Sequence, residues 1–277
     1  MHILLPPSET KRSGGGAVWS AEALRDHAML GEARERVRSA LETLCADEDA
    51  AALALKLGVK SRGEIAHNLA LAGSGAMPAV ERYTGVIYDA LDVLSLDGEA
   101  RSWVEASVSV QSALFGLVSA GDLIPAYRLS AGSRLPALGA PLKRVWRDAH
   151  AGIDWSRLGW VLDLRSKDYA ELAPLPEGAG ASLEVVQRGP DGEVRALNHF
   201  NKAAKGDLVR RLASRGEPGG ATADGPAALL AWAEREGLEM LAGDDGRSIT
   251  LVTELGPAAG PSRRVTAEAN LAVESAR

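Results

Sequence analysis

The feature that most constrains the fold of this chain is the alternation of short apolar runs with segments of helical spacing. The run "HILLPP" at 2–7 ends at two prolines and predicts a buried strand that leads into a loop. "GWVLDL" at 159–164 and "RSITLVTEL" at 247–255 predict further strands. Segments with helical periodicity separate these runs, at 21–44, 200–215 and 226–238. The alternation predicts a mixed α/β fold in which helices flank a mixed sheet.

Other patterns also predict β structure. Two β-rich runs flank the Pro-Asp-Gly turn at 190–192, which is typical of a hairpin spanning 182–200. "YTGVIYDAL" at 83–91 includes a β-like run, and "SVSVQ" at 107–111 alternates as a strand does. The last strand precedes a stretch rich in Gly, Pro and Ala. We therefore expect one domain over residues 1–255 and a flexible C-terminal tail over 256–277.

Local signals predict two helix starts and one flexible loop. Ser20 and Ser61 each precede a helical pattern and are candidate N-caps. The glycine-rich "SGGGA" at 13–17 lacks the lysine and hydroxyl residues of a P-loop. We expect it to be a flexible loop, or alternatively a mobile flap beside Lys11.

Composition narrows the functional class. The chain has 277 residues, of which 46% are hydrophobic and 25% charged, as in ordinary globular proteins. The single cysteine, Cys45, excludes an internal disulfide and lies among acids, which favours a buried, unreactive thiol. Because the chain has no signal-like start and no apolar run of membrane-spanning length, we expect a cytoplasmic protein with no membrane partner.

The distribution of charge is uneven. The net charge is −6, yet residues 123–147 contain five cations and no acid, and residues 199–215 contain five cations and one acid. Such segregation predicts an electropositive cleft that attracts an anion. The alternative is that these are ordinary solvated surface cations.

The helical segment at 200–215 places two lysines near its start. Ala204, Leu208 and Leu212 form an apolar stripe, Lys205 falls inside its arc, and Lys202 lies at its edge. Free N–H groups at a helix N-terminus and two ammonium groups would together bind an anion such as phosphate. Alternatively, the lysines extend to water or pair with an internal acid.

Six motifs occur together in the order "ILLPPSETK", "YTGVIYDALDV", "AYRLSAGSRLP", "VWRDA", "LDLRSKDYAEL" and "HFNKAAKGDLVRRL". In this combination the chain resembles the YaaA family of the bacterial peroxide stress response, from residue 1 to about 254. The resemblance implies a single mixed α/β domain of unusual topology. It also implies a positively charged cleft and a helix-hairpin-helix element, through which members resemble DNA-binding proteins.

The hairpin element best fits "LALKLGVKSRGEIAHNLA" at 53–70, where two helical stretches flank Leu57–Ser61. Such a hairpin presents backbone N–H groups to a DNA phosphate and binds without reading the base sequence. Lys60 replaces the second glycine of the usual turn. The alternative is a plain loop between two core helices.

The family's motifs map onto this chain residue by residue. "PPSETK" matches at Ser8 and Lys11, and "YR" matches at Tyr127 and Arg128. "SKDY" matches at Ser166, Asp168 and Tyr169, and "KAAKG" matches at Lys202, Lys205 and Gly206. The resulting candidates for DNA or anion binding are Lys11, Lys60, Arg62, Arg128, Arg134, Lys202, Lys205 and Arg210.

Two functions fit these residues. The first is a peroxide stress protein whose basic cleft binds DNA, without sequence preference, or another phosphate-bearing ligand. The second is an enzyme that acts on a small nucleobase-like or phosphorylated metabolite in the same cleft. Its catalytic candidates are Ser8, Lys11, Tyr169 and Lys202. The five histidines have no metal-ligand spacing, so we expect no metal, and no motif predicts a cofactor.

Overall fold

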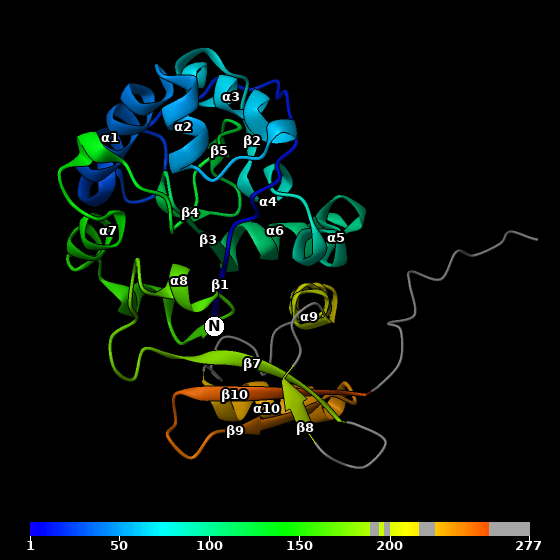
Figure 1. Ribbon diagram of the computed structural model, residues 1–277. Coiled ribbons are helices and arrows are strands. Elements are labelled where there is room, and N and C mark those ends of the chain that lie inside the picture. The colour runs from blue at the N-terminus through cyan, green and yellow to red at the C-terminus, as the bar shows by residue number, and fades with distance from the viewer. Residues whose placement is uncertain (189–193, 197–199, 216–224, 255–277) are drawn as a thin grey trace, which may run out of the picture.

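The computed structural model describes residues 1–188, 194–196, 200–215 and 225–254 (Figure 1). One mixed sheet runs through it in the order β4-β3-β1-β6-β7-β10-β9, and β8 pairs with β7. Its strands are β1 (His2–Leu5), β3 (Val108–Ser112), β4 (Gly116–Ser119), β6 (Val161–Asp163), β7 (Gly180–Arg188), β8 (Val194–Ala196), β9 (Glu239–Ala242) and β10 (Ser248–Glu254). The short strands β2 (Met77–Pro78) and β5 (Leu123–Ile124) form a separate antiparallel pair.

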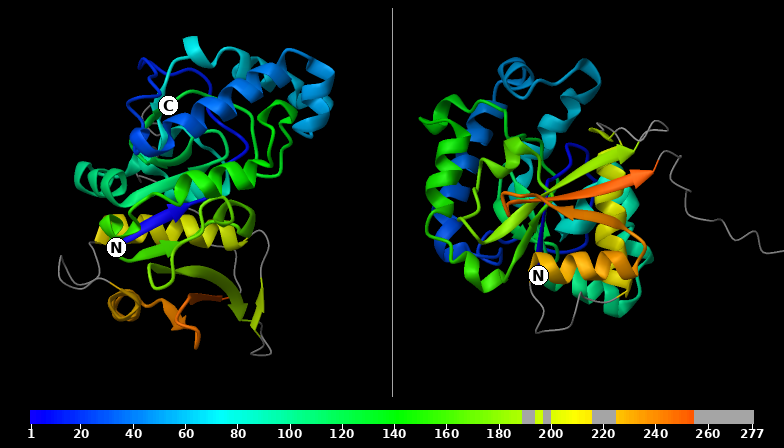
Figure 2. Two further views of the ribbon diagram at one scale, coloured as in Figure 1. Left: turned by 90° about the vertical axis from the view of Figure 1, so that its left-hand side faces the viewer. Right: turned by 90° about the horizontal axis from the view of Figure 1, so that it is seen from below.

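Helices cover both faces of the sheet (Figure 2). They are α1 (His27–Cys45), α2 (Glu48–Ala54), α3 (Ile65–Leu69), α4 (Ala79–Arg82), α5 (Val86–Leu91), α6 (Gly98–Ser107), α7 (Leu142–His150), α8 (Lys167–Ala170), α9 (Phe200–Arg215) and α10 (Pro226–Arg235). Five 3-10 turns join them: η1 (Val59–Glu64), η2 (Leu71–Gly73), η3 (Val93–Ser95), η4 (Pro136–Leu138) and η5 (Trp155–Leu158).

Alternate residues of β1 face two cores, as the period of a strand requires. Ile3 and Leu5 belong to the larger core, which includes side chains from α1, α5 and α9. Leu4 faces a smaller core with Trp155. Helix α9 lies against α5 at Gly206, where an added Cβ would come 2.1 Å from the Ile87 carbonyl oxygen. The central strand β1 is therefore buried on both sides.

The predicted fold class is confirmed, because parallel and antiparallel strands share one sheet between helices. The expected hairpin strands pair, with Val186 opposite Ala196. Its turn at 190–192 lies outside the described residues, as does the expected tail at 256–277. The strands expected at the start of the chain, at 159–164 and at 247–255 are β1, β6 and β10.

Three local predictions are wrong. The β-like run at 83–91 contains the helix α5, whose buried residues Ile87, Tyr88 and Leu91 lie on one helical face. Tertiary packing against α9 overrides the β propensity of this segment. Ser20 does not cap a helix, because α1 begins only at His27. Ser61 lies inside the turn η1 rather than at a helix start.

The segment expected to form the helix-hairpin-helix element folds as α2, the 3-10 turn η1 and the short helix α3. Asp47 caps α2 by accepting a hydrogen bond from the Ala50 N–H. Gly58, just before η1, has an extended backbone. Lys60 lies on η1 and is exposed.

Candidate functional site

The candidate site lies at the carboxyl ends of β1, β3 and β6. The chain leaves β1 toward β3 on one side and later adds β6 on the other, so β1 marks the point where strand order switches. Ligands of open α/β sheets bind outside the carboxyl ends of the strands at such a point. Pro6 and Pro7 follow β1 here, and the loop that continues from them carries Ser8 and Lys11.

Lys11 is fixed by a short antiparallel contact between this loop and the end of α4. It forms a β-bridge with Tyr83, and the Thr84 N–H donates to the Thr10 carbonyl at 3.2 Å. The Lys11 Nζ donates to the carbonyl oxygens of Ser8 (2.9 Å) and Glu9 (3.3 Å). It also lies over an aromatic face, 4.0 Å from the Tyr127 ring centroid.

Two tyrosines lie against this lysine and two more lie beside them. The Lys11 Nζ is 4.0 Å from the ring centroid of Tyr127 and 5.4 Å from that of Tyr83. The ring centroids of Tyr83 and Tyr88 are 5.3 Å apart, and Tyr83 packs edge-on against Tyr127 at 6.4 Å. These three tyrosines are buried, and the partly exposed Tyr169 contributes to raising the pKa of each of them. We call Lys11 and the four tyrosines the lysine–tyrosine cluster.

A chain of hydroxyl groups links the cluster to the end of β3. The Ser112 Oγ accepts the N–H groups of Leu114 (3.1 Å) and Phe115 (3.0 Å), so its own hydrogen donates to Tyr127, 2.8 Å away. The Tyr127 and Tyr83 hydroxyls are also 2.8 Å apart. Two tyrosine hydroxyl hydrogens are available for the single bond between Tyr83 and Tyr127. One of these hydrogens therefore takes no part in this chain of hydrogen bonds.

Burial sets the electrostatics of the cluster. Desolvation is the largest cause that lowers the pKa of Lys11 to about 7; the neighbouring Arg128 acts in the same direction, and Glu64 and Glu9 oppose the shift. Burial raises the pKa of Tyr83, Tyr88 and Tyr127 above the ordinary tyrosine value, and it raises that of Tyr169 to about 12. The tyrosines therefore stay protonated at neutral pH, whereas the lysine can release its proton.

Arg128 lies beside the cluster and closes its outer side. Its guanidinium pairs with Glu9 at 2.7 Å and with Glu64 at 3.3 Å. The buried Asn68 holds its backbone, accepting from the Arg128 N–H at 2.7 Å and donating to its carbonyl at 2.9 Å. Arg128 thus ties the loop after β1 to η1.

Comparison with known proteins places this chain in a family. A family model described as peroxide stress protein YaaA matches residues 1–218. A UPF0246 protein of Streptomyces coelicolor is 43% identical over 235 residues, covering 83% of this chain and 88% of that protein. A UPF0246 protein of Corynebacterium efficiens is 39% identical over 259 residues, covering 91% and 98%.

The chain belongs to the YaaA family. The resemblance drawn from the six motifs is therefore confirmed, and membership in YaaA associates the chain with the peroxide stress response. The family description names no substrate or ligand, so the predicted site residues have to be judged by where they lie.

Four residues predicted from the YaaA motifs come together at the site. Ser8, Lys11 and Arg128 are joined through the contacts of the loop after β1. Tyr169, at α8, accepts a hydrogen bond from the Ala131 N–H at 3.4 Å. These four residues come from three separate segments of the chain.

The remaining predicted residues lie elsewhere or are occupied. Lys205 is buried, as the helical stripe predicted, and its Nζ donates to the Leu164 carbonyl at 3.0 Å. Arg210 donates to the carbonyls of Leu91 and Asp92 at the end of α5. Arg62 pairs with Asp49 at 2.7 Å.

Three predicted cations stay exposed. Lys60, Arg134 and Lys202 have no ion-pair partner within the described residues. Lys202 was expected to lean toward the protein body, but it is exposed. The proposed anion site at the start of α9 therefore lacks Lys202 as a buried contributor; residues 197–199, which precede the helix, lie outside the described residues.

Sequence reasoning missed the parts of the site that depend on tertiary contact. Tyr83 and Ser112 were not predicted as site residues, and Asn68 was not connected to Arg128. The usable signal was scarcity, since three of the only four tyrosines in the chain are buried, and two of these three pack against one lysine.

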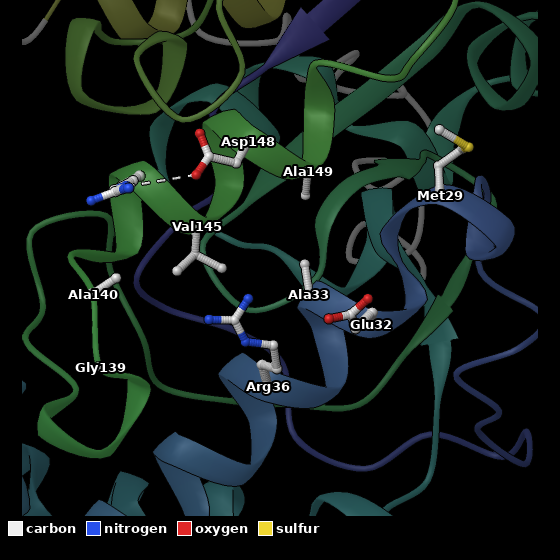
Figure 3. A pocket seen from close by; sticks show the side chains of 10 residues that line it. Met29, Glu32, Ala33, Arg36, Gly139, Ala140, Val145, Asp148 and Ala149 are labelled. Atoms are coloured by element: carbon white, nitrogen blue, oxygen red, sulfur yellow. Dashed lines mark ion pairs between the residues drawn. The ribbon is translucent and has the colours of Figure 1, made fainter.

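One hollow in the surface borders the cluster. It has a volume of about 230 Å³, is lined by Tyr83 and Tyr88, and is rimmed by Arg12, Asp89 and Asp92. A larger pocket of about 420 Å³ lies between α1 and α7; α1 contributes Arg36, and Asp148 of α7 pairs with Arg144 (Figure 3). Its lining contains none of the predicted site residues.

Two searches of the described residues gave negative results. No group of three His, Cys, Asp or Glu side chains is arranged to hold a metal ion. No helix in this part of the chain has the length and apolar character to span a bilayer. Cys45 is buried, and desolvation raises the pKa of its thiol.

Proposed function

We propose that this protein serves the peroxide stress response through an active site at the lysine–tyrosine cluster, where it acts on a small nucleobase-like or phosphorylated metabolite. The observation that carries this proposal is the packing of the Lys11 amine against Tyr83 and Tyr127 at the strand-order switch of the sheet. Perturbed titratable groups gathered at such a place favour catalysis over a purely structural role.

Each group has a chemical role that its surroundings support. Lys11 can accept or donate a proton near neutral pH, because burial lowers the pKa of its ammonium to about 7. Arg128 offers a guanidinium to a phosphate or carboxylate, for which Glu9 has to give way. Tyr169 presents a protonated hydroxyl at the partly exposed side of the cluster.

A genetic experiment tests this proposal. In a strain whose own copy is deleted, wild-type protein should restore survival of a hydrogen peroxide challenge, whereas Lys11→Met and Tyr169→Phe should not. Lys60→Met is the matched control, because Lys60 is exposed on η1, away from the cluster. Full rescue by Lys11→Met at equal protein level would contradict a catalytic site at the cluster.

A second candidate function is DNA binding without sequence preference. It is favoured by the exposed cations Lys60, Arg134 and Lys202, which carry no neutralising carboxylate among the described residues. The turn η1 carries Lys60 and would present backbone N–H groups to a phosphate, as in the helix-hairpin-helix proposal. The net charge of −6 makes any such contact local rather than a property of the whole surface.

A salt titration of duplex DNA affinity tests this second function. Three phosphate contacts predict a log–log slope of about −2.7, since each contact adds about −0.9. Lys60→Ala and Lys202→Ala should each reduce the slope by about 1. Arg62→Ala should change it less, because Arg62 already pairs with Glu48 and Asp49. Binding that does not respond to salt would argue against this function.

A further inference from the structure

We infer that Lys11 is a carbonyl-reactive amine, and that the lysine–tyrosine cluster takes an aldehyde or ketone and joins it to the Lys11 Nζ as an imine. This inference rests on the proposed catalytic function of the cluster and names its substrate class.

The contacts of the amine support this role. Within the described residues no carboxylate lies within ion-pair distance of the Lys11 Nζ, because the nearby Glu9 carboxylate pairs with Arg128 instead. The Nζ contacts two backbone carbonyls and the face of Tyr127. An amine surrounded by aromatic rings and beside a second cation is the arrangement that activates a lysine as a nucleophile. Burial and the neighbouring Arg128 lower its pKa to about 7.

Comparison with the other lysines shows what is particular to Lys11. Lys60 and Lys202 are exposed, so water solvates their ammonium groups fully. Lys205 is buried at 8% exposure and donates to the Leu164 carbonyl. Lys11 alone among these four combines a desolvated amine with a residue that is partly exposed.

The reaction balances without an oxidant or a reductant. The lone pair of the neutral Nζ forms a bond to the carbonyl carbon as the C=O π bond breaks, and one proton passes from the nitrogen to the oxygen to give a carbinolamine. The C–O bond then breaks, the oxygen leaves as water with the second nitrogen proton, and the C=N bond forms.

Reductive trapping tests the inference on the intact protein. Wild-type protein is incubated at pH 7 with butyraldehyde or pyridoxal 5′-phosphate and sodium cyanoborohydride, and modification at each lysine is measured by peptide mass spectrometry. Lys11 should be modified at least about tenfold faster than Lys60 or Lys202, because far more of its amine is unprotonated. Tyr127→Phe should slow modification at Lys11 and leave Lys60 unchanged.

The outcomes separate this inference from the proposed function. Modification of Lys11 no faster than that of Lys60 and Lys202 would overturn the imine. If Lys11→Met and Lys11→Arg both abolish peroxide survival while Lys11 resists trapping, the cluster remains the active site but its lysine transfers protons only. Fast trapping at Lys11 combined with full rescue by Lys11→Met would support the amine's reactivity and refute the proposed function.

Discussion

Two cations on facing segments, Arg82 and Lys11, are held in opposite ways. Arg82 is fully buried, and its guanidinium donates to the carbonyl oxygens of Ile124 (3.1 Å), Arg12 (2.5 Å), Gly14 (2.8 Å) and Gly75 (2.9 Å). No carboxylate pairs with it in the described part of the chain. Lys11 forms a β-bridge with Tyr83, the residue that follows Arg82. Its amine contacts two backbone carbonyls and an aromatic ring, and the residue is partly exposed.

The difference shows which cation is structural. Four of the five N–H donors of Arg82 bond backbone carbonyls, from two loops and from β5, so its guanidinium holds these segments together. It also holds the glycine-rich loop at 13–17, which was expected to be flexible, through bonds to the carbonyls of Gly14 and Gly75. The two segments are so close that an added Cβ at Gly75 would lie 2.1 Å from the Gly15 carbonyl oxygen. Lys11 is held by its neighbours yet can lose its proton and can be reached. Burial alone therefore does not distinguish a site residue from a structural one; unfilled chemical capacity does.

The largest effect is expected from removing the structural cation. Arg82→Met leaves the four carbonyls without their donor in a buried place and should lower the free energy of unfolding by about 3–5 kcal/mol. Urea denaturation measures this. Arg12→Ala is the matched control, because the neighbouring Arg12 side chain is exposed and should change stability by less than about 0.5 kcal/mol. Equal losses from the two variants would contradict the structural role of Arg82.

A smaller effect is expected at the ring beneath Lys11. Tyr127→Phe keeps the ring beneath Lys11 but removes the hydroxyl that bonds Ser112 and Tyr83, and should cost about 1–3 kcal/mol. The same urea experiment measures it. Tyr169→Phe, which removes one weak contact at a partly exposed position, should cost less. If the two changes cost the same, the hydroxyl chain contributes nothing to stability.

Much of this fold could be predicted from sequence because local patterns report local burial. The run at His2–Leu5 correctly predicted a buried strand, and the apolar arc of α9 correctly predicted that Lys205 points inward. The segment of α5 was predicted incorrectly, because its β-branched residues favour a strand until Gly206 lets α9 approach it closely. That approach is a long-range property that no window of sequence contains.

The site was only half predictable for a related reason. Motif matching named Ser8, Lys11 and Arg128, which contacts of the loop after β1 join. It did not distinguish the buried Lys205 from Lys11, which is partly exposed and packs against two tyrosine rings. Which cation stays reactive depends on strand order and on the contacts that each side chain finds. Those are consequences of the whole fold rather than of residue type.

The smallest effect at neutral pH is expected from Lys11→Met, at about 1 kcal/mol or less, because lost polar contacts offset the relief of desolvation. The direction in which this stability difference changes with pH follows from the pKa of Lys11. The pKa of Lys11 is about 7 in the folded chain and near 10.5 in the unfolded chain. Between these values the unfolded wild type binds the extra proton, so wild-type stability should rise relative to the variant from pH 7 to 10.

Urea denaturation of wild type and Lys11→Met at several pH values measures the difference in their free energies of unfolding. The charged neighbours Arg128, Arg82, Glu64 and Glu9 are present in both proteins, so their own contributions largely cancel in this difference. Lys60→Met, at an exposed position away from the cluster, is the control for the substitution itself. A difference between wild type and Lys11→Met that stays flat from pH 7 to 10 would mean that the Lys11 ammonium is not desolvated in the folded chain. The contrast between Arg82, whose N–H donors are mostly bonded to carbonyls, and Lys11, whose amine can lose its proton, would then fail because both side chains would stay charged.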